Sequence, residues 1–144
     1  MENKKEKLED FKTAISSTVR SISNSEKIEV SFGNQTPKSE KNSIKLPELS
    51  QINNKLNFDQ IRAMADSKSL NFRFSDDKTF KEYEPVGNIS KRLYKISEKI
   101  RCEKIGTSYF KGVKNNIEKF YQERLSGLDL KSSEDKIIES FENY

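Results

Sequence analysis

Apolar residues recur every three or four positions near the amino terminus, with charged and hydroxyl residues between them. The apolar positions are Leu8, Phe11, Ile15, Val19 and Ile22. This spacing places them on one stripe of an α-helix. Ser23-Asn24-Ser25 is a turn-forming cluster that would end the helix. We therefore predict an amphipathic helix over residues 4–22.

A period of two replaces the helical period after this helix. Ile28, Val30 and Phe32 alternate with polar residues, and 44–46 alternates again before a proline. Alternation of this kind is typical of half-buried strands. The residues between them, 34–43, are polar and have no pattern, which predicts a mobile loop. The sequence thus predicts a small β-hairpin near residues 27–46, packed on helices because an isolated hairpin is marginal in water.

The middle of the chain predicts two more helices. Asn57 followed three residues later by Gln60 has the pattern of a helix start, and apolar residues follow at helical spacing. Residues 70–76 fit a helix or a strand, because their apolar positions alternate. Asp76 would then cap a short helix that reaches Tyr83.

A long helical pattern runs from Asn88 to about residue 125. Its first apolar stripe comprises Ile89, Leu93, Ile96 and Ile100, and its second comprises Ile105, Tyr109, Val113, Ile117 and Phe120. The two stripes lie on different faces, and the change falls just before Gly106. Either the helix bends there or different neighbours contact its two halves. Ser133 could cap a last amphipathic turn, so we interpret 127–144 as the start of a following segment or a linker. The fold class is mainly α: a single domain over 1–144 with a long carboxyl-side helix.

Composition adds that the core is small. Apolar residues make up 32% of the 144 residues and charged residues 35%, so part of the burial is expected to come from a partner or from further chain. The net charge of +4 arises from interspersed basic and acidic residues, which does not favour nucleic-acid binding. The sequence has no run of about 20 apolar residues, so no membrane span is expected. A single cysteine does not indicate an oxidising compartment, and the cytoplasm is the expected location.

Catalytic chemistry is sparsely represented. Histidine is absent, one cysteine cannot form a thiolate metal cluster, and no glycine-rich phosphate loop occurs. We therefore expect no catalytic, cofactor-binding or metal-binding residue here. Cys102 stands beside two basic residues, which could lower the pKa of its thiol, although a small core residue is the favoured interpretation.

Two further groups of polar residues have simple explanations. Asp76-Asp77 could be paired carboxylates, but a helix cap followed by a first-turn acid is favoured. The run Asp66-Ser67-Lys68-Ser69 has serines at the wrong offsets for an integrin-type metal loop. A solvated helix face is favoured for this run.

Three blocks of the sequence resemble one known family, the CobT subunits of aerobic, ATP-dependent cobaltochelatase. The first is Phe11-Lys12-x-Ala14-Ile15-x-x-Thr18-Val19-Arg20-x-Ile22 with Ile28-Glu29-Val30-Ser31-Phe32. The second is Ile61-Arg62-Ala63-Met64-Ala65-Asp66-Ser67 with Leu70. The third is Glu98-x-x-Arg101-Cys102-Glu103-Lys104-Ile105-Gly106 with Gly112-Val113-x-x-Asn116-Ile117. The blocks occur in order over roughly residues 8–140, and they are similar to the amino-terminal region of the family.

This resemblance implies a role in inserting Co²⁺ into the corrin ring during cobalamin biosynthesis. It implies two partners, an AAA+ CobS-type subunit that uses ATP and Mg²⁺ and a large subunit that binds the corrin. The family's integrin-like metal-binding domain is not in this chain. Where the family has His-Asp and a further His, this sequence has Ser75-Asp76 and Phe80, so a role of those histidines could not operate here.

Our first hypothesis is a non-catalytic assembly module that docks on the AAA+ partner or on sister subunits. The alternative is a CobT-like partner of an AAA+ ATPase that acts on a client other than a corrin. A small metal enzyme and a basic nucleic-acid module are weaker rivals. The interaction residues that we select are Glu98, Arg101, Glu103 and Asn116, although intramolecular pairing would explain them too. Gly106 and Gly112 are interpreted as places where another backbone approaches the helix.

Overall fold

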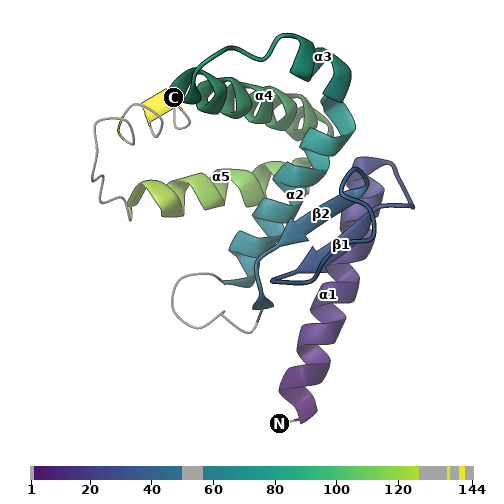
Figure 1. The fold of residues 1–144 in the computed structure, drawn as a ribbon. Helices are drawn as coiled ribbons and strands as arrows, with labels where there is room; N and C mark the ends of the chain where they lie inside the picture. Colours follow the sequence, from purple (N-terminus) through teal and green to yellow (C-terminus); the bar gives the residue numbers. More distant parts are fainter. Residues whose placement is uncertain (1, 50–56, 127–135, 137–139, 142–144) are drawn as a thin grey trace. The chain divides into compact units, whose positions relative to one another are not determined.

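A computed structural model of the chain describes residues 2–49, 57–126, 136, 140 and 141 (Figure 1). The chain divides into two compact units, Met1–Arg73 and Phe74–Tyr144. Each unit is described by itself below. The fold is mainly helical with one small sheet, so the predicted fold class is confirmed. The grouping of all 144 residues into a single domain stays a prediction.

The first unit contains α1 (Glu2–Ser23), β1 (Glu29–Phe32), β2 (Ser43–Leu46) and α2 (Phe58–Phe74) up to its last residue. The predicted first helix is confirmed, with bounds shifted by two residues at the start and one at the end. Asn57 and Gln60 form the reciprocal cap that the sequence indicates. The Gln60 amide donates to Asn57 Oδ1 at 2.8 Å, and the Asn57 amide donates to Gln60 Oε1 at 3.0 Å. Residues 70–74 are helical, which settles the ambiguity left by their alternation.

The two strands form a parallel pair rather than the expected hairpin. Glu29 is aligned with Ser43 and Phe32 with Leu46. Alternation determines which side chains face the core but not the direction in which the second strand runs. Strands of four residues span about 13 Å, and the segment 33–42 is long enough to carry the chain back over that distance. The sheet therefore keeps the predicted positions and faces while its second strand is reversed.

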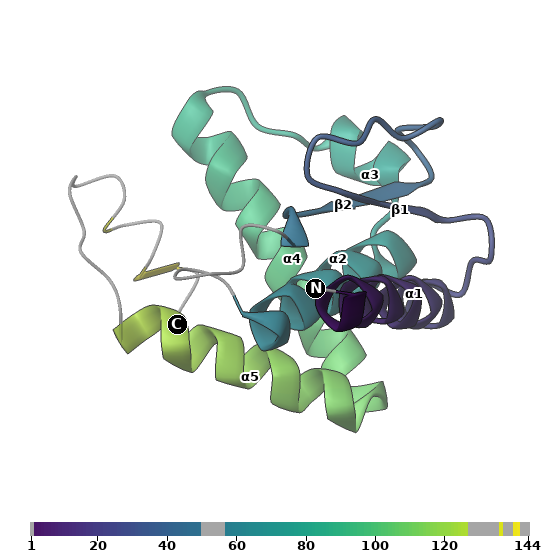
Figure 2. The same cartoon turned by 90° about the horizontal axis from the view of Figure 1, so that it is seen from below.

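The core of this unit lies where α1, α2 and one face of the sheet meet; both strands lie beside α1 in two views (Figure 1 and Figure 2). Its buried members are Ile15, Val19, Ile28, Phe32, Ile44, Leu46, Leu49, Ile61 and Ala65. The rings of Phe11 and Phe58 meet edge to face with centroids 4.5 Å apart. Near the other end of α1, the Arg73 guanidinium donates to the Ile22 carbonyl at 3.0 Å. The two helices are thus tied together at both ends of their contact.

Several outward-facing backbone groups of the two edge strands are already hydrogen-bonded. On β1, the Phe32 amide donates to the Gln35 side chain at 3.0 Å. Just before β1, the Ile28 carbonyl accepts from the Arg20 guanidinium at 3.2 Å. On β2, the Lys68 ammonium donates to the Lys45 carbonyl at 2.7 Å. Pro47, just after β2, has no amide hydrogen to offer. Side chains from neighbouring elements therefore cover part of both sheet edges.

The second unit begins with a short capped helix, α3 (Asp77–Glu82). The Asp76 side chain accepts from the Thr79 amide at 3.1 Å, so the predicted N-cap is confirmed. The Tyr94 hydroxyl donates to the Phe80 carbonyl at 3.1 Å, and their rings stack with centroids 4.5 Å apart. These contacts fix α3 against the next helix.

The predicted long helix is two helices, α4 (Asn88–Tyr109) and α5 (Lys111–Ser126). The break falls at Phe110, whose φ of −119° and ψ of 95° are extended. Phe110 closes α4 by donating its amide to the Gly106 carbonyl at 2.9 Å, and its own carbonyl accepts the Lys114 amide at 3.0 Å at the start of α5. The first apolar stripe lies wholly on α4, whereas the second begins on α4 with Ile105 and Tyr109 and continues on α5 beyond the break at Phe110. The two helices pack on each other. Most of the interpretation given for 127–144 lies outside the described residues.

Candidate interaction site

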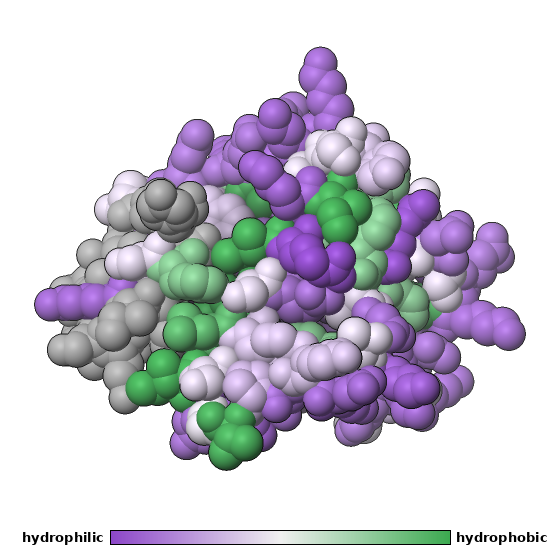
Figure 3. Space-filling view, turned by 90° about the horizontal axis from the view of Figure 1, so that it is seen from above, coloured by the Kyte–Doolittle hydropathy of each residue, from purple (hydrophilic) through white to green (hydrophobic). Residues whose placement is uncertain are grey.

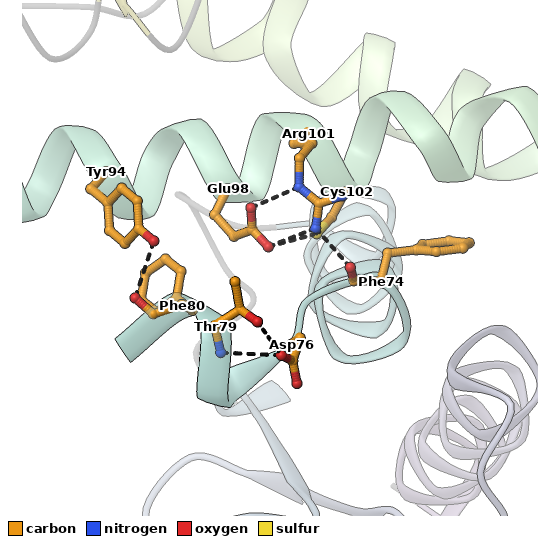
Figure 4. Close-up of polar contacts among 8 residues, drawn as sticks. All are labelled: Phe74, Asp76, Thr79, Phe80, Tyr94, Glu98, Arg101 and Cys102. Carbon is orange, nitrogen blue, oxygen red and sulfur yellow. Dashed lines mark hydrogen bonds and ion pairs between the residues drawn. The ribbon is translucent and has the colours of Figure 1, made fainter. Parts of the chain in front are cut away.

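Two of the selected residues, Glu98 and Arg101, pair with each other on α4 (Figure 4). The guanidinium donates through Nε to Glu98 Oε2 at 2.8 Å and through Nη2 to Glu98 Oε1 at 2.7 Å. This geometry is the bidentate arrangement of an arginine and a carboxylate. The hydrogen bonds from Arg101 hold the pKa of Glu98 below its usual range, and the carboxylate raises the pKa of Arg101.

The same arginine also binds the end of α2. Its Nη2 donates to the carbonyl of Phe74, the last residue of that helix, at 2.7 Å (Figure 4). The last carbonyls of a helix have no partner within the helix, so a cation there is favourable. Arg101 therefore serves an intramolecular purpose, as the alternative explanation of these residue types anticipated.

Cys102 is a buried thiol with no exposed surface. Burial, followed by the nearby Glu98 carboxylate, raises the pKa of Cys102 to about 11. The thiolate is the reactive form of cysteine, and this environment disfavours it. The interpretation of Cys102 as a small core residue is confirmed, and the idea of a lowered pKa is wrong because burial outweighs the neighbouring cations.

Glu103 is buried and satisfied within the second unit. Only 6% of the residue is exposed, and the Tyr121 hydroxyl of α5 donates to its Oε2 at 2.9 Å. Asn116 is half-buried on α5. Gly106 is buried and supplies the carbonyl that ends α4. A Cβ added at Gly112 would meet no atom of the described chain within 4 Å, so the expected close approach there is wrong.

The polar run on α2 differs from its interpretation as a solvated face. Asp66, Ser67 and Ser69 are buried, whereas Lys68 is exposed. The Ser69 hydroxyl donates to the Ala65 carbonyl at 2.7 Å. A serine can pair its hydroxyl with the backbone of its own helix in this way, and it can therefore be buried. For this reason the polar residue types in this run did not indicate a buried helix face.

A groove of about 960 Å³ opens along α4 in the second unit. Apolar and cationic side chains line it together, and the described lining residues are Leu93, Ser97, Ile100, Arg101, Lys104, Ile105, Lys136, Ser140 and Phe141. The sequence indicated the apolar stripe of α4 but gave no sign that its surface stays open. Among the residues that line the groove, only Arg101 was selected from the sequence.

A smaller hollow of about 500 Å³ lies in the first unit between β2 and α2. Its described lining includes Lys45, Glu48 and Lys68. Although Lys68 is exposed overall, partial desolvation of its ammonium lowers its pKa, and this group donates to the Lys45 carbonyl at 2.7 Å. Gly33 borders this hollow with a φ of +62°, and the Glu48 side chain lies against it. The hollow joins a sheet edge to a helix and holds charges of both signs.

The described part of the chain lacks two kinds of feature. No group of three or more His, Cys, Asp or Glu residues there could hold a metal ion. No described helix is long and apolar enough to cross a bilayer. What the described residues present is a pair of small helical units with charged surfaces, internally paired carboxylates and an open apolar groove. These features define a mainly helical protein with a small parallel sheet.

Comparison with known proteins gives the family. The family model of cobalamin biosynthesis protein CobT matches residues 5–137. The chain therefore belongs to the CobT family, and the resemblance noted in the sequence is confirmed. This membership implies involvement in cobalamin biosynthesis. No solved structure matches the chain.

Proposed function

We propose that this chain is a non-catalytic assembly module of an ATP-dependent cobaltochelatase, which inserts Co²⁺ into the corrin ring. In this proposal the chain docks a CobT subunit onto an AAA+ partner, and the large corrin-binding subunit completes the complex. Membership of the CobT family supports the pathway. The cobalt ion and the corrin are substrates of the whole complex.

The single observation that carries the docking role is the exposure of large apolar side chains in the second unit. Tyr83 is 67% exposed, Val86 96% and Ile89 42%, all within one short stretch between α3 and α4. Single exposed apolar residues are normal on a surface, and three that lie so close together in the sequence favour an interaction site here. A partner that covers this stretch would remove apolar surface from water, which favours association.

Internal pairing of the polar groups supports a module without chemistry of its own. Glu98 is held by Arg101, Glu103 by Tyr121, and burial raises the pKa of Cys102 to about 11. Groups held in this way are unsuited to proton transfer or nucleophilic attack near neutral pH. The sequence has no glycine-rich phosphate loop, so ATP and Mg²⁺ would be bound by the AAA+ partner.

Co-purification tests the proposal. The tagged 144-residue chain is mixed with the AAA+ subunit encoded by the same organism, with ATP, with ADP and without nucleotide. We expect capture of the AAA+ subunit and a change in its ATPase rate. Val86→Asp should weaken capture, because the charge falls in the exposed apolar stretch, whereas Lys78→Asp on the polar surface of α3 should not. Neither capture nor any change in ATPase rate would contradict the proposal.

A further inference from the structure

The amino-terminal half of α4 presents an apolar stripe that the described chain leaves partly open. Leu93, Ile96 and Ile100 are each only half-buried, and the fully buried residues of α4 are confined to its second half: Cys102, Glu103 and Gly106. Most of the stability of a helix in a protein comes from packing of its apolar face. A helix with this stripe therefore has apolar surface that can still be covered.

The groove follows this stripe along the helix axis. Leu93, Ser97, Ile100 and Lys104 are spaced by four, three and four residues, so they lie on one face. From Leu93 to Ile105 the helix rises by about 18 Å. The side of the chain seen from above carries green apolar side chains among purple polar ones (Figure 3). An elongated hollow of about 960 Å³ with this length matches roughly three turns of a second helix.

The charge of the groove is one-sided. Its described lining includes Arg101, Lys104 and Lys136 and no carboxylate. The whole of α4 has six basic and two acidic residues. Both acids are engaged inside the second unit, Glu98 by Arg101 and Glu103 by Tyr121. The charged side chains among the described lining residues are therefore all cationic, and an acidic partner would match them.

We propose that the groove along α4 binds an acidic amphipathic helix of a partner protein. Apolar side chains of that helix, at positions i, i+3 or i+4, and i+7, would face Leu93, Ile100 and Ile105. Its Asp or Glu residues would flank the groove and meet Lys104 and Lys136. The inference rests on the proposed assembly function and specifies the chemistry of the surface that the partner presents.

The lining favours a helix over a nucleic acid. Recognition of single strands uses several aromatic side chains as stacking platforms, whereas the described lining of this groove has a single aromatic residue, Phe141. Duplex binding needs cations that reach phosphates along a backbone, and Arg101 is already held by Glu98 and the Phe74 carbonyl. An apolar floor about three turns long is the form of a helix-binding groove.

A synthetic peptide tests this directly on the full 144-residue chain. The probe is a helical peptide of about 14 residues with leucines on one face and glutamates on both flanks. Its matched control keeps the leucines and replaces the glutamates by lysines. Binding is followed by amide chemical shifts in NMR and by fluorescence anisotropy. We expect shifts at Leu93, Ser97 and Ile100, and an affinity for the acidic peptide at least about tenfold higher than for the basic one.

Matched variants locate the contact. Lys104→Glu should lower the affinity for the acidic peptide several-fold, and Leu93→Glu should abolish binding of that peptide. Lys95→Glu is the same charge reversal on α4 outside the described groove lining. Tyr109→Glu introduces an acid at an exposed apolar position outside that lining. Both variants should bind the peptide as the wild type does. Circular dichroism verifies folding, and Lys104→Glu remains informative if Leu93→Glu misfolds.

Four results would overturn the inference. Three of them are no binding of the acidic peptide, equal affinity for both peptides, and shifts that fall on other residues. The fourth is a short duplex DNA that binds the groove residues as tightly as the acidic peptide does. The result is separable from the assembly role. If the chain captures the AAA+ subunit but does not bind the peptide, the proposed function stands and the groove inference fails. If the chain binds the peptide but does not capture the AAA+ subunit, the proposed function fails and the groove inference stands.

Discussion

The hydroxyl of Tyr121 lies 2.9 Å from a carboxylate oxygen of Glu103, a residue of which only 6% is exposed. The contact joins α5 to α4, and a buried carboxylate needs donors to offset its lost hydration. Tyr121→Phe keeps the ring, and with it the aromatic face 5.3 Å from the Lys99 ammonium. It removes only the donor, so we expect the free energy of unfolding to fall by about 1–3 kcal/mol.

Tyr109→Phe provides the matched control for this change. Tyr109 is 72% exposed and stacks on Phe74, a contact that the Phe ring retains. Urea unfolding of both variants measures the difference, and the Tyr109 variant should change by less than about 0.5 kcal/mol. Equal effects of the two changes would show that the bond to Glu103 contributes nothing to stability.

The Glu98–Arg101 pair predicts a pH dependence of stability. The pKa of Glu98 is lowered in the folded chain, mainly by the hydrogen bonds from Arg101. The folded state therefore holds this carboxylate charged at pH values where the unfolded state has begun to bind a proton. The stabilisation is fully present above the unfolded pKa of about 4.3, and it is lost as the pH falls through the lowered folded value.

Glu98→Gln tests this prediction. The difference in unfolding free energy between wild type and variant should be largest near pH 7 and shrink below about pH 4. Thermal unfolding monitored by circular dichroism from pH 7 to pH 3 measures it. Glu118→Gln on α5, whose oxygen lies 3.8 Å from the Lys114 ammonium at an exposed position, is the control, because exposed pairs contribute little. A difference for Glu98→Gln that does not depend on pH would refute the assignment.

Cys102 should react slowly while the chain is folded. Burial raises the pKa of its thiol to about 11, so little thiolate is present at pH 8 and reagents have no access to it. We expect modification by an aromatic disulfide reagent to be at least about tenfold slower in buffer than in denaturing urea. A native rate equal to the denatured rate would place the thiol at the surface. Because the folded pKa of this thiol is raised, its contribution to stability is fully present below the unfolded pKa of about 8.5 and is lost as the pH rises through the folded value of about 11.

Two glycines should respond in opposite directions to alanine. Gly112 lies in α5 with open space where a Cβ would be, so Gly112→Ala should stabilise the chain by about 0.5–1 kcal/mol through the unfolded state. Gly33 has a φ of +62°, and its added Cβ would meet the Glu48 Cβ at 2.9 Å. Gly33→Ala should therefore destabilise the chain. Melting temperatures of the two variants measure both effects, and a shift in the same direction would contradict the geometry.

The sequence predicted those features that depend on local spacing. The stripe of α1, the reciprocal cap at Asn57 and Gln60, and the Asp76 cap all follow from residues a few positions apart. The direction of β2 does not, because Ile44 and Leu46 face the core in either direction. The helix break at Phe110 was also missed, since no proline, glycine or capping side chain occurs at that position, and only the rotation between the two stripes gave a sign of it.

The candidate site shows the same division. Glu98 and Arg101 were selected for their types and spacing, yet the structure reveals a bond to the Phe74 carbonyl that no spacing rule contains. The openness of the groove was equally hidden. An apolar stripe indicates that a helix face tends to be covered, and it does not say whether the same chain covers it.

The side chains that cover part of both sheet edges have a consequence for how copies of this chain meet. A bare strand edge can recruit a strand from another molecule, which is a common route to domain exchange and to ordered aggregates. Several of the backbone groups that an incoming strand would need are already hydrogen-bonded. Their partners are Lys68 at the Lys45 carbonyl, and Gln35 and Arg20 along β1. At high concentration this chain should therefore resist forming intermolecular β-structure, which leaves its helices as the surfaces for stable association.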